Sequence, residues 1–458
     1  MVAPNKVHFT DSYAGGKLFK TWDEVLKVHF LPIVQDQFER NARLMSIFDK
    51  NDKLSIDGRQ AIFDVKIAPN QAIGSRILGD YSLTDAKGNQ KHKQVTVWHK
   101  SHHARIEIPG QVIRAGRSSI GRFVDIVTDE MDGIVKDFSK NLNRQLHRDG
   151  TGILGTATGV TAAGGGADSY ITLGAGDSSK WLHHIEVGEP ISLITKVTAT
   201  GVYGVVNDIG GEIVYVTGVD KDNRRVYVSI DASATYDGAF FAANSLQICH
   251  YRNVSVEAGS SNLKLVTGEL QGLESFCSAT DPTPEGLQGL PVATNAYWKA
   301  FVKDAGGTFE EFILMALLQA ASAQGADIHN EYYLMSNYGV KNNLIQTLVA
   351  NNRRWDTNEI VGGYKCVKFE SGEGEVNLIV DIDAPKNSLK GFSTSVNQFS
   401  SVYSKLFDWL NGRNGEILKS KEINNEDVYT ATLIGDFELI TKARFWNINY
   451  FNLPETWL

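Results

Sequence analysis

The chain has 458 residues, of which 42% are hydrophobic and 21% are charged, so it is long enough for roughly three domains that each bury a core. Its 45 Lys and Arg residues face 53 Asp and Glu residues, and the net charge of -8 excludes a protein held to nucleic acid by overall positive charge. The most apolar run, from Phe312 to Ala321, is about half the ~20 residues that a membrane helix needs, and no secretory signal is recognisable.

The three cysteines lie far apart in the sequence and show no metal-binding spacing. We therefore expect buried thiols in a soluble protein of the cytoplasm.

The first 53 residues are expected to form an arm and a kinked helix. Thr21-Trp22-Asp23-Glu24 is a capping box, which begins a helix predicted to reach residue 48. Pro32 should kink this helix. The polar residues before Thr21 show no apolar pattern, so we expect them to become ordered only against another surface.

Residues 54 to 110 alternate between apolar and polar side chains in the manner of strands. Strands are predicted at 61–69, 94–100 and 104–114, and Lys87-Gly88-Asn89 is a turn signal between the first two. This pattern predicts a long hairpin with a charged tip. Because few apolar residues are close by in the sequence, we expect the hairpin to need a partner surface.

A very long helix is predicted between Ser118 and Arg148. Apolar residues recur there at helical spacing from Ile120 to Leu146, either Ser118 or Ser119 supplies the N-cap, and Gly150 ends the helix. At 1.5 Å per residue such a helix is ~45 Å long, well beyond the usual globular length.

The remainder of the chain predicts an α+β protein. Short strands between residues 156 and 256 favour a small β-barrel or sandwich of five or six strands. Helices are expected over 308–325, with Thr308 as N-cap, and over 336–352, and a buried strand over 375–383. The end of the chain is again strand-like.

The stretch HRDGTGILG, from His147 to Gly155, contains two motifs of nucleotide enzymes. Gly150 to Gly155 match GxGxxG, but a dinucleotide site needs a strand before the first Gly and a helix after the last, and here that order is reversed. A kinase catalytic loop needs Asn where this chain has Leu154. The sequence favours a helix end, with His147 and Arg148 near the terminal carbonyls, and leaves a nucleotide-binding enzyme as an alternative.

No catalytic residue, cofactor or metal is predicted. Histidines gather at two places, and we interpret them as solvated or interface residues because adjacent His102 and His103 point to opposite faces of a strand. The two groups are His92, His99, His102 and His103, and His183 with His184. Four arginines cluster in the sequence where the hairpin returns to the long helix: Arg105, Arg114, Arg117 and Arg122. We expect them to contact a neighbouring subunit, nucleic acid or residues of their own chain.

The order of these elements resembles that of the major capsid proteins of tailed bacteriophages, which have the Hong Kong-type shell fold. Five stretches carry the resemblance: 68–76, 116–154, 297–307, 336–344 and 427–439. The resemblance implies an N-terminal arm and kinked helix (1–53), an extended hairpin loop (54–110), a peripheral domain with a spine helix (111–155), an inserted β domain (156–256), a return segment of the peripheral domain (257–294), an axial α/β domain (295–410) and C-terminal peripheral strands (411–458).

The resemblance also implies a structural, non-enzymatic role. Copies of the chain would form hexamers and pentamers of an icosahedral virion capsid, assembled in the host cytoplasm around double-stranded DNA. A portal and a separate scaffolding protein are implied partners, and a decoration protein is left open. An encapsulin-like nanocompartment subunit is the alternative within the same fold. Hairpin residues expected to contact a neighbouring subunit are Arg76, Asp80, Asp85, Lys87, Lys91 and Lys93.

Overall fold

The computed structural model divides the chain into two compact units. Unit 1 comprises residues 1–46, 101–142 and 403–437, and unit 2 comprises residues 47–100, 143–402 and 438–458. The structure describes residues 44, 47–48, 55–57, 60–68, 70, 89–110, 120–162, 169–174, 181–197, 203–206, 208–209, 212–229, 244–250, 254–256, 265–282, 286–350, 360–361, 364–365, 367–371, 374–402, 406–410, 419–420 and 428–455. The predicted arm and the helix over 21–48 therefore lie almost entirely outside the described residues.

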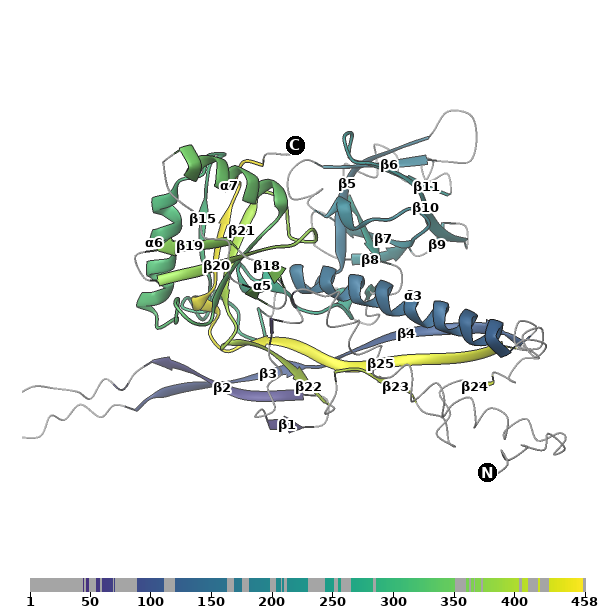
Figure 1. Ribbon diagram of the computed structural model, residues 1–458, viewed down its shortest axis with the longest axis horizontal. Helices are drawn as coiled ribbons and strands as arrows, with labels where there is room; N and C mark the ends of the chain where they lie inside the picture. Colours follow the sequence, from purple (N-terminus) through teal and green to yellow (C-terminus); the bar gives the residue numbers. More distant parts are fainter. Residues whose placement is uncertain are drawn as a thin grey trace, which may run out of the picture. The chain divides into compact units, whose positions relative to one another are not determined.

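The predicted long helix is present as α3, Ile120–His147, whose 28 residues make it ~42 Å long (Figure 1). In unit 1 its buried positions Val135, Phe138 and Leu142 recur at three and four residues, as the apolar stripe requires. Ser118 and Ser119, the two candidate N-caps, lie outside the described residues.

Strands β4 (Lys100–Pro109) and β25 (Val428–Thr441) pair with each other, and β25 also pairs with the short strands β23 (Asp408–Trp409) and β24 (Lys419–Ser420). Within unit 1, aromatic rings fill the space beside these strands. The ring of Phe407 makes edge-on contacts with Phe138 at 5.1 Å and with Phe437 at 4.9 Å, and Phe437 also meets His102 at 4.7 Å. His102 is buried and His103 is exposed, which confirms their predicted placement on opposite faces.

The predicted hairpin forms from β2 (Gln60–Ala68) and β3 (Lys91–Trp98), which pair antiparallel, with β1 (Ser55–Asp57) beside β2 (Figure 1). One face of the hairpin is buried against other residues of unit 2, because Val65, Val95 and Val97 form an apolar cluster with Leu290, Trp298 and Ile440. The described part of the hairpin thus finds one packing surface within its own chain, which the sequence had not indicated.

The predicted β insert is a barrel in unit 2. Its strands pair in the order β8-β7-β12-β5-β6-β11-β10-β9, and β7 also pairs with β10, so that the six strands from β7 to β10 close on themselves. Fourteen buried apolar side chains, Leu193 and Val226 among them, fill the interior. The strands are β5 (Ile153–Ala162), β6 (Ser169–Leu173), β7 (Pro190–Val197), β8 (Tyr203–Val206), β9 (Asp208–Ile209), β10 (Glu212–Asp220), β11 (Arg225–Val228) and β12 (Asn244–His250).

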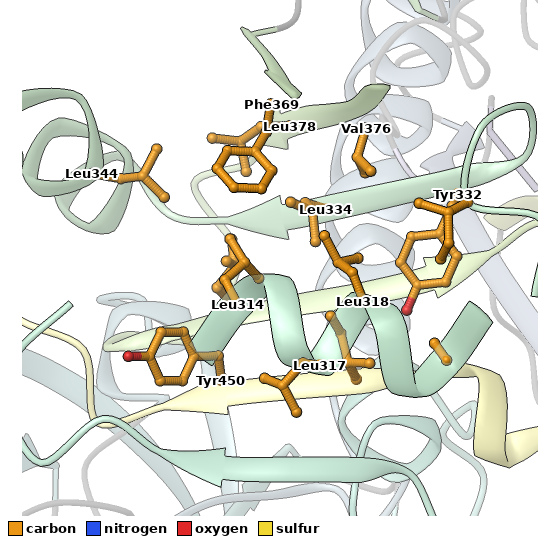
Figure 2. Close-up of a cluster of buried hydrophobic side chains, with 14 of the residues drawn as sticks. Leu314, Leu317, Leu318, Tyr332, Leu334, Leu344, Phe369, Val376, Leu378 and Tyr450 are labelled. Atoms are coloured by element: carbon orange, nitrogen blue, oxygen red, sulfur yellow. The ribbon is translucent and has the colours of Figure 1, made fainter. Parts of the chain in front are cut away.

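A mixed six-stranded sheet forms the second part of unit 2, in the order β15-β26-β21-β16-β20-β19. Helices α6 (Glu311–Ala323) and α7 (Tyr338–Ala350) pack on it, and side chains of both helices meet those of five strands in one apolar cluster (Figure 2). The strands are β15 (Phe301–Asp304), β16 (Tyr332–Ser336), β19 (Val367–Ser371), β20 (Gly374–Val380), β21 (Ser388–Ser393) and β26 (Ile448–Phe451).

Thr308 is not the N-cap of α6, so that prediction is wrong. The helix begins at Glu311 with Glu310 as its N-cap and without a side-chain capping bond. The backbone N–H of Thr308 instead donates to Ala305 O at 3.2 Å, and that of Glu310 donates to the Tyr450 hydroxyl at 3.0 Å. These bonds hold residues 305–310 as a turn, so that the helix begins two residues later than predicted.

Several short elements connect the larger ones. They are β13 (Val254–Val256), β14 (Leu265–Thr267), β17 (Ile360–Val361), β18 (Tyr364–Lys365), β22 (Asn397–Ser401), α5 (Leu273–Phe276) and the 3₁₀ turns η2 (Leu182–His184) and η3 (Arg444–Trp446). In the described part of the chain, no helix has the length and apolar character of a membrane span. The expected α+β fold is confirmed, with its hairpin, spine helix, inserted barrel and α/β sheet.

Candidate functional site

The glycine motif lies between the end of α3 and the start of β5. Gly150 and Gly152 have φ angles of +76° and +74°, in the left-handed region that favours glycine. The Asp149 carboxylate accepts hydrogen bonds from the Thr151 backbone N–H at 3.0 Å and the Thr151 hydroxyl at 2.7 Å. A helix therefore precedes the motif and a strand follows it, so a bound phosphate would meet the negative end of the α3 dipole.

The remaining motif residues are packing residues of the fold. Leu154, at the position of the kinase asparagine, is buried in the barrel core. A side chain at Gly150 would come within 2.9 Å of the Leu270 carbonyl oxygen. This geometry favours a chain reversal between the helix and the barrel over a nucleotide pocket.

A buried ion pair fixes the end of α3 to the segment before α5. Arg144 donates to both oxygens of Glu269, at 2.7 and 3.2 Å, and these side chains are 5% and 1% exposed. Burial alone would raise the pKa of Glu269, but the positive charges of Arg144 and Arg148 outweigh it, so this pKa lies well below its ordinary value. Glu269 is consequently ionised; it is hydrogen-bonded to Arg144 and is also stabilised by the nearby charge of Arg148.

Further bonds hold the same segment along its backbone. The Leu270 N–H donates to Gln145 Oε1 at 3.1 Å, and the Gln271 N–H donates to Glu438 Oε1 at 2.8 Å. Lys100 donates to the Glu269 carbonyl and lies 3.2 Å from Glu438 Oε2. The strand residues Lys100 and Glu438 thereby connect the segment to β4 and β25.

Arg148 is fully buried, and its guanidinium stacks on Trp181 at 5.2 Å from the ring centroid. Among the described residues no atom accepts a hydrogen bond from its guanidinium nitrogens, and burial lowers its pKa. Arg148 directly follows the helix, and its backbone N–H donates to Gln145 O at 3.1 Å. The side chain that donates to a helix-terminal carbonyl is that of Lys390, which lies 3.4 Å from His147 O.

The turn after β20 binds the other side of the helix end. Asn143 Nδ2 donates to Asp381 Oδ2 at 3.0 Å and to Asp383 Oδ2 at 2.6 Å. His147 Nε2 lies 3.3 Å from Asp381 Oδ2, and His184 Nε2, next to the barrel, lies 3.7 Å from Asp383 Oδ1.

The pKa of Asp381 reflects this environment. Burial would raise it, but the contacts with His147 and Asn143 lower it well below its ordinary value. We call the residues around the end of α3 the polar junction: Lys100, Asn143, Arg144, Gln145, His147, Arg148, Trp181, His184, Glu269, Asp381, Asp383, Lys390 and Glu438.

The structure does not bring the predicted interface residues together. Lys91 is exposed on β3, whereas Lys93 donates to Asn295 Oδ1 at 3.3 Å. Arg105 forms a partly exposed ion pair with Glu107 on the same strand at 2.7 Å, and Arg122 lies within α3. Arg76, Asp80, Asp85, Lys87, Arg114 and Arg117 lie outside the described residues. Their roles as interface residues stay predictions.

Sequence reasoning missed the polar junction. The sequence holds one local signal of it, a run of polar residues at the end of the helix, from Asn143 to Gln145 and then His147 and Arg148. Polar residues at a helix end are usually exposed, but in this structure all five are buried. The described histidines, cysteines and carboxylates include no group of three that could hold a metal ion.

No protein-family model and no curated protein sequence matches the chain. Among solved structures, the capsid asymmetric unit of cyanophage A-1(L) is similar with a TM-score of 0.46 and 11% identity, over 90% of this chain and 93% of that chain. The holo-SrpI encapsulin of Synechococcus elongatus gives a TM-score of 0.42 and 8% identity over 90% and 88% of the two chains. The capsid of a native GTA particle gives 0.36 and 9%, over 90% of each. The chain is thus similar, along most of its length, to capsid chains and to an encapsulin.

Proposed function

We propose that the chain is the major capsid protein of a tailed bacteriophage. In this proposal its copies form hexamers and pentamers, and these close an icosahedral head around double-stranded DNA after assembly in the host cytoplasm. A portal and a separate scaffolding protein are the proposed partners. The acidic net charge of -8 is compatible with this role, because a closed shell retains DNA by enclosure without a specific grip.

The polar junction is the observation that carries the proposal. Residues that resemble catalytic motifs hold the fold together there: Arg148 stacks on Trp181, His147 lies beside Asp381, and Asp149 caps the turn at Thr151. Within unit 2, the junction joins the last residues of α3 to the barrel and to the six-stranded sheet. Polar residues that serve packing in this way suit a structural subunit.

We assign proposed roles to the domains that the sequence predicts. The hairpin over 54–110 is proposed to contact a neighbouring subunit through the residues named above, and residues 295–410 to surround the centre of each capsomer. The outer face of β3 supports this for the hairpin, since Trp98 is 61% exposed on a strand whose other face is buried. The arginines Arg105, Arg114, Arg117 and Arg122 are proposed to face a neighbouring subunit or the interior.

Electron microscopy of the expressed full chain, with and without a candidate scaffolding protein, tests the proposal. We expect capsomers or closed shells. A monodisperse monomer that binds ATP or NAD in a calorimetric titration would contradict it and support the enzyme alternative. Shells that are purified from cells and contain a protein cargo in place of DNA would support the encapsulin-like alternative.

A further inference from the structure

His250 lies where the chain leaves the barrel. It is the last residue of β12, which is the last barrel strand in the sequence, and it is 8% exposed. It pairs with Ile191 of β7, so the end of β12 lies beside the turn that leads into β7. We call residues 186–190 together with His250 the barrel exit. A titratable side chain is thus buried at the point where the barrel joins the rest of unit 2.

Among the described residues, the His250 ring has a hydrogen-bond partner at one of its two nitrogens. Nδ1 contacts Glu189 Oε1, and because a carboxylate only accepts hydrogen bonds, Nδ1 carries the hydrogen. Nε2 is buried and has no hydrogen-bond partner in the part of the chain that the structure describes. A second hydrogen, on Nε2, would therefore point at no acceptor there. The geometry fits a neutral ring.

Charged groups from three parts of unit 2 face this ring. The turn before β7 contributes Glu189, the end of α3 contributes Arg144, and the segment before α5 contributes Glu269. Both oxygens of Glu269 already accept bonds from Arg144. Further cations lie beside Glu269, namely Arg148 and Lys100. Glu189 is thus the acid that compensates a charge on the ring most directly.

These surroundings disfavour a positive charge on His250. Burial lowers its pKa, and the positive charge of Arg144 lowers it further. The bond to Glu189 and the negative charges of Glu189 and Glu269 act in the opposite direction and do not outweigh these effects, so the pKa of His250 lies below its ordinary value. An exposed histidine takes up a proton below pH ~6.5. In acid, the proton therefore favours a state in which the ring is exposed to water.

The barrel exit can open while the barrel stays folded. Neither His250 nor any of residues 186–190 belongs to the fourteen buried apolar side chains of the barrel interior. Backbone bonds hold the turn to β10: the Gly188 N–H donates to Val216 O at 2.7 Å, and the Val216 N–H donates to Glu189 O at 3.0 Å. Segments with few buried apolar contacts open locally at a free energy well below that of global unfolding. The amides of Gly188 and Val216 therefore report this opening.

We propose that the barrel exit is an acid-sensitive contact: when the His250 ring takes up a second proton, residues 186–190 separate from β10 and from the end of β12, and the barrel is held less firmly beside the end of α3. The contact contributes its full stability above pH ~6.5, where an exposed histidine is also neutral. Below that pH the ratio of closed to open states falls by up to about tenfold for each pH unit, until the folded pKa is reached. This inference goes beyond the proposed function and does not depend on it.

Hydrogen exchange of the unassembled full chain at pH ~7.5 and pH ~5.5 tests the inference, with protection factors used to remove the intrinsic pH dependence of exchange. We expect the Gly188 and Val216 amides to lose about tenfold in protection at the lower pH, while those of β21 in the six-stranded sheet keep theirs. His250→Gln keeps a hydrogen-bond donor for Glu189 and takes up no proton, so its protection should be the same at both pH values. The matched control is His329→Gln, which changes an exposed histidine of the same unit and should behave as the wild type does.

Wild-type protection that is equal at the two pH values would overturn the inference, and this comparison needs no variant to fold. A loss of protection that persists in His250→Gln would also overturn it, because another group would then respond to the pH. The chosen pH range avoids Asp381, since carboxylates of ordinary pKa take up protons only near pH ~3.9 and the pKa of Asp381 is lower still. Either result leaves the proposed function intact, because the exchange is measured on single subunits.

Discussion

Glu269→Gln is the substitution that most directly perturbs the polar junction. The change keeps the shape of the side chain and removes its negative charge. Arg144 then keeps at most one acceptor from the former carboxylate, and Arg148 loses the nearby charge that compensates its own. Two positive charges are left in a site where the Arg144 and Glu269 side chains are no more than 5% exposed.

The expected cost follows from burial. Removing one partner of a buried ion pair costs about 3–5 kcal/mol, because the remaining charge is uncompensated. A domain of ordinary stability has only about 5–15 kcal/mol in total, so the loss is a large fraction of it. The matched control is Glu107→Gln, which removes the partner of Arg105 in a pair that is 43% and 52% exposed. Exposed pairs contribute about 0–1 kcal/mol, so we expect a small effect there.

Urea unfolding of the unassembled subunit, followed by tryptophan fluorescence, measures both variants. Trp181 and Trp298 are buried and provide the signal. We expect a clearly lower midpoint for Glu269→Gln and a midpoint near the wild type for Glu107→Gln. If the two substitutions cost the same, Glu269 does not stabilise the junction in the way the geometry indicates.

Three other substitutions test separate parts of the fold. Gly272→Ala should cost at least about 1–3 kcal/mol in urea unfolding, because its Cβ would press on backbone carbonyls at the end of α3, 2.6 Å from Arg148 O, and backbone cannot give way; wild-type stability would contradict this packing. Asp381→Asn should flatten the loss of stability in acid: the folded pKa of Asp381 is lowered, so its contribution is complete above its unfolded pKa and is lost as the pH falls towards the folded pKa. An unchanged acid limb of the stability curve would show that this carboxylate is not stabilised by folding. Deleting residues 79–91 should leave folded subunits and impair shell closure in electron microscopy, and normal, stable shells would refute the proposed hairpin contact.

Local periodicity predicts the elements of this protein well. The apolar stripe places α3 within two residues of its observed bounds, and α7, predicted over 336–352, is found over Tyr338–Ala350. Alternation predicts the hairpin strands and the small barrel, because strands of these types each bury one face. Periodicity does not predict the start of α6, since hydrogen bonds from the backbone N–H groups of Glu310 and Thr308 to Tyr450 and Ala305 decide where this helix begins.

The polar junction depends on contacts that no local pattern contains. Arg144 and Glu269 are 125 positions apart, and Asn143 and Asp381 are 238 positions apart. Each of these residues, read alone, resembles a solvated polar side chain at a helix end or in a turn. Only the fold shows that they share one buried site, and that HRDGTGILG is the corner of that site.

The masses of the species that the purified full chain forms show whether it assembles as a shell protein. Mass photometry across a dilution series resolves single chains, rings and shells. We expect species at five and six chain masses, together with much larger closed particles at high concentration. A single species at one chain mass at every concentration, also with a candidate scaffolding protein present, would contradict it.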